Sequence, residues 1–347
     1  MPFLPPGAQS PSTRRPQVSA AERAGPMAHW GRFLLMLLPI PALVFHVPLW
    51  IEQFTSIEFP VHLKGVVVIT GASSGIGRHA ALALDAGGMT VFAGVRSREA
   101  AESLLAARPS IRTILWDVTS AEQTDAAVAA VSAAMRAEGL QLAGLVNNAG
   151  ISHRMPLELD SLESIRGLYD VNLFGAIRAT KAFLPLMRES AGRVVFISSL
   201  AGLVAQKGSA AYSGSKFALE ATADALRLEL APWQISVSIV EPGFVRTAIA
   251  QKQTGESAGA AARSAAHPSA PLYAAWVEAA DARRLRMEEK AAAPFVVSSA
   301  IAHALAAPRP RTRYAVANVD GTPAWAISWL VWLLPDRLQD RFIFSRK

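Results

Sequence analysis

The feature that most constrains this fold is an alternation of short apolar runs with alanine-rich stretches of helical length, which begins at Val66. Each run is bounded by turn residues, as buried strands are. Strands joined by helices in this order lie parallel, and helices then cover both faces of the sheet. The pattern therefore predicts an α/β fold with a doubly wound parallel sheet. The predicted strands are Val66–Thr70, Thr90–Val95, Thr113–Trp116, Leu142–Val146, Arg193–Ser198 and Ser236–Val240.

A glycine-rich loop follows the first predicted strand and precedes a predicted helix. Three glycines in such a turn let backbone N–H groups approach a phosphate closely, and the helix N-terminus adds a partial positive charge. We therefore interpret the loop as the phosphate-binding turn of a dinucleotide site. Its predicted ligand-binding residues are Gly71, Ser73, Ser74, Gly75, Ile76 and Gly77.

The same loop also satisfies the G-x-S-x-G pattern of a hydrolase nucleophile elbow, with Ser73 as the nucleophile. That reading needs an acid and then a histidine downstream. His153, His267 and His303 are the candidate histidines. A serine hydrolase acting through Ser73 is therefore kept as a remote alternative.

Further motifs follow the later predicted strands in a fixed order. They are Asn147-Asn148-Ala149-Gly150, Asp170-Val171-Asn172, Ser198-Ser199, Tyr212-Ser213-Gly214-Ser215-Lys216 and Pro242-Gly243-Phe244-Val245-Arg246-Thr247. With the glycine loop, this set resembles the short-chain dehydrogenase/reductase superfamily, in its single-domain branch, over roughly residues 65–319. The resemblance looks closest to members that act on 17β-hydroxysteroids and retinol. It implies a Rossmann-type sheet of seven strands, a nicotinamide cofactor, and a homodimer or homotetramer formed through the helices that carry Asn172 and Tyr212.

The resemblance also implies a catalytic group of Ser199, Tyr212, Lys216 and Asn172. Tyr212 and Lys216 are four residues apart, so they share one face of a helix. A lysine ammonium beside a phenol favours the phenolate, which lowers the phenol's pKa from its usual value of about 10. Tyr212 is then expected to exchange a proton with the substrate oxygen, while Ser199 hydrogen-bonds that oxygen and Asn172 holds a water. The resemblance assigns Asn148, Tyr212, Lys216, Pro242, Gly243 and Thr247 to the cofactor site.

The end of the second predicted strand bears on cofactor choice. No acid stands at Val95 to bind a ribose 2′-hydroxyl, and Arg96 suits a 2′-phosphate, so NADP(H) is favoured and NAD(H) stays open. Ser74 stands where many NADP-binding relatives carry a second basic residue. Asp117 matches the family's adenine-contacting aspartate, although an aspartate there can also simply end a strand.

The N-terminal region differs from the rest in composition. Residues 1–32 are rich in Pro, Ala, Ser and Arg, which is typical of a disordered leader or a targeting segment. Residues 33–52 form a candidate membrane anchor, because Phe33–Ile51 has no formal charge and is long enough to span a bilayer. Three prolines within it keep a kinked span, a hairpin, an interfacial segment or a strap on the domain open. The sequence thus predicts a membrane-associated protein, at the endoplasmic reticulum or another organelle membrane.

The catalytic domain is predicted over residues 60–320, with a substrate lid at about 248–294. The lid region reads as a Gly/Ala/Ser-rich loop and then an amphipathic helix, which suits a cover over an apolar pocket. Alternatively, Leu272 and Trp276 of this helix simply pack on the core. Together with the anchor, the lid predicts a lipophilic carbonyl or alcohol substrate of steroid, retinoid or long-chain acyl type.

Residues 321–347 form a predicted apolar and basic tail. Within it, the Trp-rich stretch Trp325–Leu334 is too short to span a membrane and reads as an interfacial helix. A helix that caps the sheet or forms a subunit interface is the alternative.

Composition limits the remaining classes of function. The chain has no cysteine, so it has no disulfide and no thiolate nucleophile, and its seven histidines lack metal-binding spacing, so we predict no metal. The net charge of +7 is concentrated near the C-terminus, without a nucleic-acid-binding module. We therefore predict an NADP(H)-dependent oxidoreductase with no nucleic-acid partner; a catalytically silent cofactor sensor or scaffold is the alternative.

Overall fold

The computed structural model describes residues 57–247 and 267–339. These residues belong to one compact unit, Ile57–Lys347. The predicted leader and the anchor candidate at 33–52 lie outside the described residues, as does the first part of the predicted lid. Within the described ranges, no helix is both long enough and apolar enough to cross a membrane.

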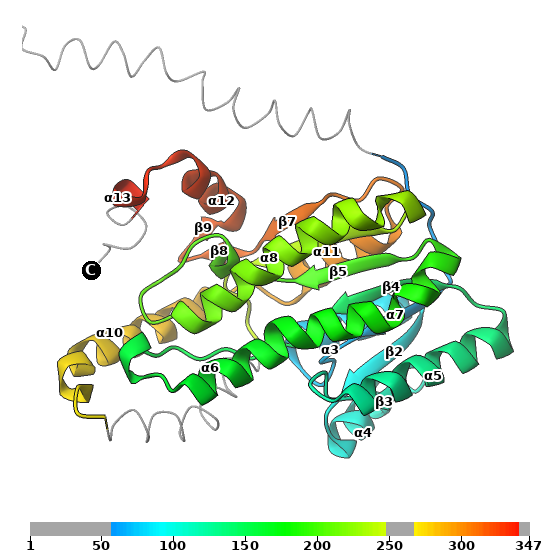
Figure 1. Ribbon diagram of the computed structural model, residues 1–347, viewed down its shortest axis with the longest axis horizontal. Coiled ribbons are helices and arrows are strands. Elements are labelled where there is room, and N and C mark those ends of the chain that lie inside the picture. The colour runs from blue at the N-terminus through cyan, green and yellow to red at the C-terminus, as the bar shows by residue number, and fades with distance from the viewer. Residues whose placement is uncertain (1–56, 248–266, 340–347) are drawn as a thin grey trace, which may run out of the picture. The chain divides into compact units, whose positions relative to one another are not determined.

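A seven-stranded parallel sheet forms the centre of the fold, as predicted (Figure 1). Its strand order is β3-β2-β1-β4-β5-β6-β7, so the chain leaves β1 first toward one edge and then returns to build the other. This reversal places a topological switch point between β1 and β4, where α/β proteins bind ligands. The strands are β1 (Val66–Ile69), β2 (Thr90–Val95), β3 (Arg112–Leu115), β4 (Leu142–Asn147), β5 (Arg193–Ile197), β6 (Ser236–Pro242) and β7 (Arg313–Val316).

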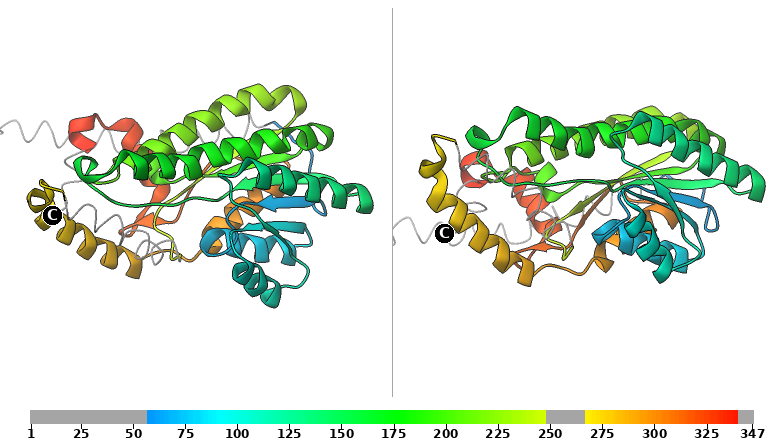
Figure 2. Two further views of the ribbon diagram at one scale, coloured as in Figure 1. Left: turned by 60° about the horizontal axis from the view of Figure 1, so that its bottom comes forward. Right: turned by 90° about the horizontal axis from the view of Figure 1, so that it is seen from below.

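Helices cover both faces of the sheet (Figure 2). One face carries α3 (Gly75–Ala86), α4 (Arg98–Ala107) and α11 (Phe295–Ala306). The other carries α5 (Ala121–Glu138), α7 (Ala176–Ser190) and α8 (Ala210–Leu230). The remaining elements are η1 (Leu157–Leu159), α6 (Leu162–Tyr169), η2 (Asp170–Gly175), η3 (Leu200–Gly202), η4 (Ala231–Trp233), α10 (Ala270–Glu289), β8 (Asn318–Val319), β9 (Thr322–Pro323), α12 (Ala324–Leu333) and α13 (Asp336–Gln339).

Strand β1 shows why the strands read as continuous apolar runs. Val66 and Val68 belong to the hydrophobic core on the α5/α7/α8 face, whereas Val67 and Ile69 belong to the core on the α3/α11 face. All four side chains are fully buried. Because successive side chains of a strand point to opposite faces, a strand covered on both sides needs apolar residues at every position.

Strand β7 was not found among the apolar runs of the sequence. It pairs with the buried strand β6, from Ile239 opposite Arg313 to Pro242 opposite Val316. Only Tyr314 of β7 is buried, because β7 is the edge strand. A four-residue edge strand that opens with an arginine lacks the pattern by which the other strands were predicted.

The two C-terminal helices that the sequence predicted are present as α10 and α12. In α10, Trp276 packs over Gly208 and its ring faces the Lys207 ammonium at 5.5 Å, whereas Leu272 is 82% exposed. In α12, Ile327 packs with Leu200 and Val204 against the domain. The opposite side of α12 leaves apolar side chains exposed, namely Trp325, Trp332 and Leu333.

Candidate active site

The glycine loop turns tightly from β1 into α3. Gly71 and Gly75 have φ values of +66° and +58°, a left-handed conformation that favours glycine. A Cβ on Gly71 would lie 2.7 Å from the Cα of Ala149, and one on Gly77 would lie 2.3 Å from Nδ2 of Asn148. The loop is therefore packed against the end of β4 so closely that side chains do not fit.

Asn148 and Thr70 hold this loop in place. Asn148 Nδ2 donates to the carbonyl oxygens of Thr70 at 2.9 Å and of Gly71 at 3.0 Å. The Thr70 hydroxyl accepts from the backbone N–H groups of Asn148 and Ala149, both at 3.0 Å. At the start of α3, the side chain of Ser74 makes no capping hydrogen bond. The loop backbone is thus held rigidly, and the N–H groups at the N-terminus of α3 are not capped by Ser74. This arrangement fits the pyrophosphate of a dinucleotide.

One cavity brings together residues from distant parts of the sequence at the carboxyl ends of the central strands. Thr247 is also close to the glycine loop, because a Cβ on Gly75 would lie 3.0 Å from the Cβ of Thr247. The cavity thus joins the predicted cofactor residues to the predicted catalytic pair. The predicted residues that line it are Ile76, Asn148, Ser199, Tyr212, Lys216, Pro242, Gly243 and Thr247.

Tyr212 and Lys216 lie on the first two turns of α8, as their spacing predicted. The Lys216 ammonium stands 5.9 Å from the centre of the Tyr212 ring and donates to the carbonyl oxygen of Ile197 at 2.9 Å. Lys216 is only 4% exposed. Burial lowers the pKa of Lys216 to about 8, and the carboxylate of Glu220 partly opposes this by favouring the ammonium.

The pKa of Tyr212 moves in the opposite direction from the expected one. Burial raises the pKa of the Tyr212 phenol, while the Ser199 hydroxyl and the Arg154 guanidinium oppose the rise. The desolvation of the phenolate outweighs these partners because the phenol is enclosed. Ser199 and Arg154 thus partly offset the rise in the pKa of Tyr212.

Asn172 lies behind this pair rather than in the cavity wall. It is 1% exposed and sits in a π-helical stretch, η2, between α6 and α7. Its Nδ2 donates to the carbonyl oxygen of Ile151 at 2.9 Å and to Ser215 Oγ at 3.1 Å, and its Oδ1 accepts from Ile151 N–H at 2.8 Å. Asn172 thus ties the strand β4 loop to helix α8, and its role with water remains a prediction.

The two residues predicted to contact the adenosine end follow neighbouring strands. Arg96 comes directly after β2 and Asp117 comes shortly after β3, and these strands pair with Val95 opposite Leu115. Arg96 is exposed. The carboxylate of Asp117 accepts from Thr119 N–H at 2.9 Å and from Thr119 Oγ1 at 2.7 Å, which stabilises the turn after β3. Asp117 therefore stabilises the turn after β3. Its contact with the adenine of the cofactor stays a prediction.

The hydrolase alternative finds no catalytic partner for Ser73. His153 Nε2 lies 2.6 Å from Asp160 Oδ2, His303 Nδ1 lies 2.8 Å from the Tyr314 hydroxyl, and His267 accepts from the N–H of Ser269. In the ranges that the structure describes, each candidate histidine is engaged away from the glycine loop. Those same ranges contain no cluster of residues suited to a metal ion.

Several side chains of the cavity were missed by the sequence analysis. Arg154, Gln206, Arg284 and Glu288 all line it. Arg154 Nη2 donates to Gln206 Oε1 at 2.8 Å, and Arg284 pairs with Glu288 at 2.9 Å. Arg154 follows the Asn-Asn-Ala-Gly motif by only a few residues, but no spacing rule in the sequence marks it as a cavity residue.

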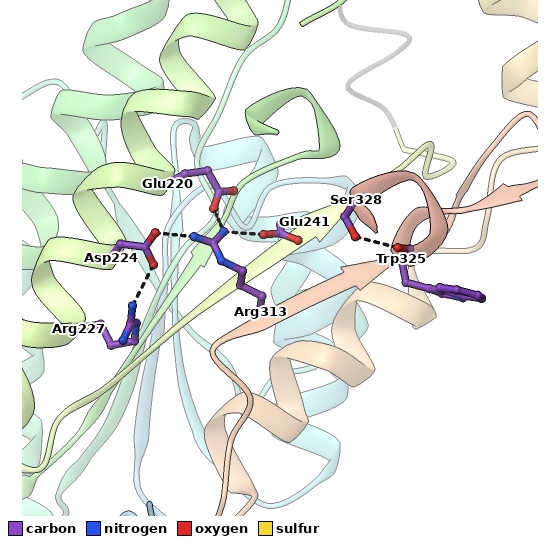
Figure 3. A network of polar contacts seen from close by, with 7 residues as sticks. All are labelled: Glu220, Asp224, Arg227, Glu241, Arg313, Trp325 and Ser328. Carbon is purple, nitrogen blue, oxygen red and sulfur yellow. Dashed lines mark hydrogen bonds and ion pairs between the residues drawn. The ribbon is translucent and has the colours of Figure 1, made fainter. Parts of the chain in front are cut away.

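A second missed feature is an ionic network beneath α8 (Figure 3). Arg313 of β7 contacts Glu220 and, at 2.5 Å, Asp224 of α8, and it contacts Glu241 of β6 at 2.7 Å. Burial and the nearby Glu220 raise the pKa of Glu241 to about 7, and Arg313 opposes this. Because Glu220 is one turn beyond Lys216, the network anchors the helix that carries the Tyr-Lys pair.

A parallel α/β fold with a backbone phosphate cradle and an enclosed Tyr-Lys pair in one cavity defines a class of dinucleotide-dependent oxidoreductases. Residues 65–258 match the short chain dehydrogenase family. The chain belongs to this family and is an NAD(P)-dependent oxidoreductase that acts on alcohol or carbonyl groups.

Characterised relatives cover much of the chain. It is 36% identical over 286 residues to retinol dehydrogenase 5 of Mus musculus, across 79% of this chain and 86% of the relative. It is 38% identical over 202 residues to the mitochondrial D-beta-hydroxybutyrate dehydrogenase of Bos taurus, across 57% of this chain and 58% of the relative. A short chain dehydrogenase from Burkholderia cenocepacia J2315, solved in complex with NADP, has a TM-score of 0.61 and 25% identity, across 82% of this chain and 100% of its own.

Proposed function

We propose that this protein is an NADP(H)-dependent carbonyl reductase or alcohol dehydrogenase for a lipophilic substrate, with Tyr212 as the acid and base. The observation that carries the proposal is the cavity in which Ser199, Tyr212 and Lys216 meet the residues that fit a dinucleotide. When bound, the nicotinamide cofactor supplies or accepts the hydride that accompanies the interconversion of carbonyl and alcohol.

Side chains of the protein transfer the proton that accompanies the hydride. In the direction of reduction, the Tyr212 hydroxyl donates its proton to the carbonyl oxygen, and the Ser199 hydroxyl hydrogen-bonds that oxygen and orients the substrate. In the direction of oxidation, the Tyr212 phenolate takes the proton of the alcohol. Lys216, with its pKa lowered to about 8, carries a positive charge near neutral pH and favours the phenolate during turnover.

Arg96 supports the preference for NADP(H). Its exposed guanidinium after β2 is free of carboxylate partners among the described side chains, and a guanidinium binds phosphate through paired hydrogen bonds. Cells keep NADPH mostly reduced, so this preference favours carbonyl reduction. Replacing Arg96 with alanine is expected to lower kcat/KM with NADPH by about 10-fold or more, with little change for NADH. Arg98→Ala, which removes a neighbouring exposed arginine, is the matched control.

A lipophilic substrate is supported by the apolar part of the cavity wall, which includes Ile151, Leu200, Phe244, Val245 and Val319. Helix α10 contributes Arg284 and Glu288 to the same wall, which supports its proposed role as part of a substrate lid. The relative named for retinol supports the same class, because retinol is a lipophilic alcohol.

Association with an organelle membrane is part of the proposal. The exposed tryptophans of α12 suit the membrane–water interface, where indole rings are enriched, and one relative is named as mitochondrial. The proposed homodimer or homotetramer would cover Phe174 of η2 and Phe217 of α8, which are 49% and 43% exposed.

The test is turnover by the detergent-solubilised full chain, followed by the absorbance of the reduced cofactor. NADPH and NADH would each be tried against retinal, keto-steroids, long-chain 3-oxo compounds and small carbonyls. We expect NADPH-dependent reduction of at least one lipophilic carbonyl. Tight binding of NADP(H) without turnover of any compound in either direction would favour a silent cofactor sensor instead.

A further inference from the structure

Arg154 is an unusual residue for a cavity that is otherwise suited to a lipophilic compound. It lies in the loop after β4 and lines the same cavity as Tyr212 and Ser199. Within the described ranges, its guanidinium makes one hydrogen bond to a protein acceptor, the 2.8 Å bond from Nη2 to the neutral amide oxygen of Gln206. Among the side chains that the structure describes, no carboxylate forms an ion pair with Arg154.

A partly buried guanidinium without a carboxylate partner is destabilised. Burial lowers the pKa of Arg154, and the nearby Arg283 and Arg284 lower it further. A buried charge is tolerated when it is paired and hydrogen-bonded, and a neutral amide satisfies only one of the five guanidinium N–H donors. The other cavity arginine, Arg284, already has the carboxylate of Glu288 at 2.9 Å. Of the two cavity arginines, Arg154 is therefore the one without a carboxylate partner among the described side chains.

The position of Arg154 fixes where an anion would bind. Arg154 lines the same cavity as Ser199 and Tyr212, and Tyr212 is the proposed proton donor and acceptor. Gln206, the hydrogen-bond partner of Arg154, belongs to the segment between Ser199 and Tyr212. An anion bound by Arg154 would thus lie close to the carbon on which the reaction takes place, and not at a remote end of the substrate.

The surrounding wall limits the rest of the ligand. Ile151, Leu200 and Phe244 lie in the same cavity, so the remainder of the molecule is apolar. A guanidinium binds a planar carboxylate through two parallel hydrogen bonds, and a carboxylate is the anion that an oxidisable or reducible apolar compound most simply carries. The combination selects a carboxylic acid with an apolar chain.

We propose that Arg154 binds the carboxylate of the substrate, and that the substrate class is an oxo or hydroxy acid with its carboxylate a few bonds from the reacting carbon and an apolar chain beyond. The inference rests on the proposed function for the reaction itself. The site, however, is a property of the cavity and can be tested without turnover.

The test is a binding titration of the full chain, saturated with NADP⁺, with decanoate and with methyl decanoate. These probes share the apolar chain and differ in the negative charge. We expect wild type to bind decanoate about 10- to 100-fold more tightly than the ester, as a charged hydrogen-bonded pair does. Arg154→Met should remove this preference, and Arg154→Lys should restore part of it.

Arg286→Met is the matched control, because Arg286 is an exposed arginine of α10 that does not line the cavity. It should keep the preference of wild type. Equal affinities of wild type for acid and ester would overturn the proposal. So would an Arg154→Met protein that loses NADP⁺ binding and thermal stability together with decanoate, since Arg154 would then be a structural residue. Arg154-dependent binding of decanoate without turnover of any oxo acid would leave the site intact and count against the proposed reaction.

Discussion

The two halves of the candidate site are built in different ways. The dinucleotide half is the glycine loop beside the cavity, where backbone packs on backbone and Gly77 and Gly71 lie so close to the end of β4 that no side chain fits. The other half is formed by side chains from the loop after β4 and from α10, such as Arg154 and Glu288. Close backbone approach fixes residue identity, whereas a wall of side chains can be rebuilt for each substrate. The difference explains why one half carries a sequence motif and the other does not.

The largest expected effect comes from the residue where the two halves meet. Tyr212→Phe removes the proton donor and keeps the ring, so kcat should fall about 10²- to 10⁴-fold while NADP⁺ affinity changes little. Steady-state kinetics and a cofactor titration measure the two quantities separately. An active Tyr212→Phe enzyme would mean that another group transfers the proton.

The next effect should be confined to the dinucleotide half. In Gly77→Ala the new methyl would lie 2.3 Å from Asn148 Nδ2 and 2.6 Å from the carbonyl oxygen of Gly71. The loop must shift, at a cost of about 1–3 kcal/mol in stability, and cofactor affinity should fall at least about 10-fold. Gly167→Ala is the control, because a Cβ there meets nothing within 4 Å. A thermal melt with and without NADP⁺ reports both changes, and equal behaviour of the two variants would contradict the close packing of the loop.

A smaller effect is expected from the support beneath α8. The pKa of Lys216 is lowered to about 8, so its positive charge is present below pH 8 and is lost as the pH rises through that value. The alkaline limb of kcat/KM should follow this loss. Glu220 favours the ammonium, so Glu220→Gln lowers the pKa of Lys216 further and should move the alkaline limb to lower pH.

Asp224→Asn separates this electrostatic effect from a loss of anchoring. Asp224 also contacts Arg313, at 2.5 Å, but does not contribute to the pKa shift of Lys216. The Asp224→Asn substitution should therefore leave the alkaline limb of the kcat/KM profile at the pH found for wild type. Identical pH profiles for the Glu220→Gln and Asp224→Asn enzymes would show that Glu220 acts only as an anchor for Arg313.

The sequence predicted the parallel sheet and the tight glycine loop after β1, because both depend on local patterns. The fully buried strand β1 reads as an unbroken apolar run, and Gly71 and Gly75 adopt left-handed conformations in the loop. Strand β7 escaped this reading because it is a short edge strand that opens with Arg313. The raised pKa of Tyr212 could not be predicted from the sequence either. Burial in the folded protein changes this pKa more than any neighbouring group does.

Arg154 and Glu220 escaped prediction for a different reason. Their roles arise only when segments far apart in the chain come together, as when Arg313 reaches Glu220 across 93 positions of sequence. No periodicity or spacing records such a contact. Residues of this kind become visible as functional residues only through the folded geometry.

The central claim is that this cavity transfers a hydride to a carbonyl with a proton from Tyr212. The most direct measurement follows deuterium from the reactive position of reduced NADP into the product, by mass spectrometry, for wild type and Tyr212→Phe. With a carbonyl substrate that wild type reduces, we predict one deuterium on the new carbinol carbon, and labelled alcohol formed about 10²- to 10⁴-fold more slowly by Tyr212→Phe. Product without the label, or equal labelled product from both proteins, would contradict the account.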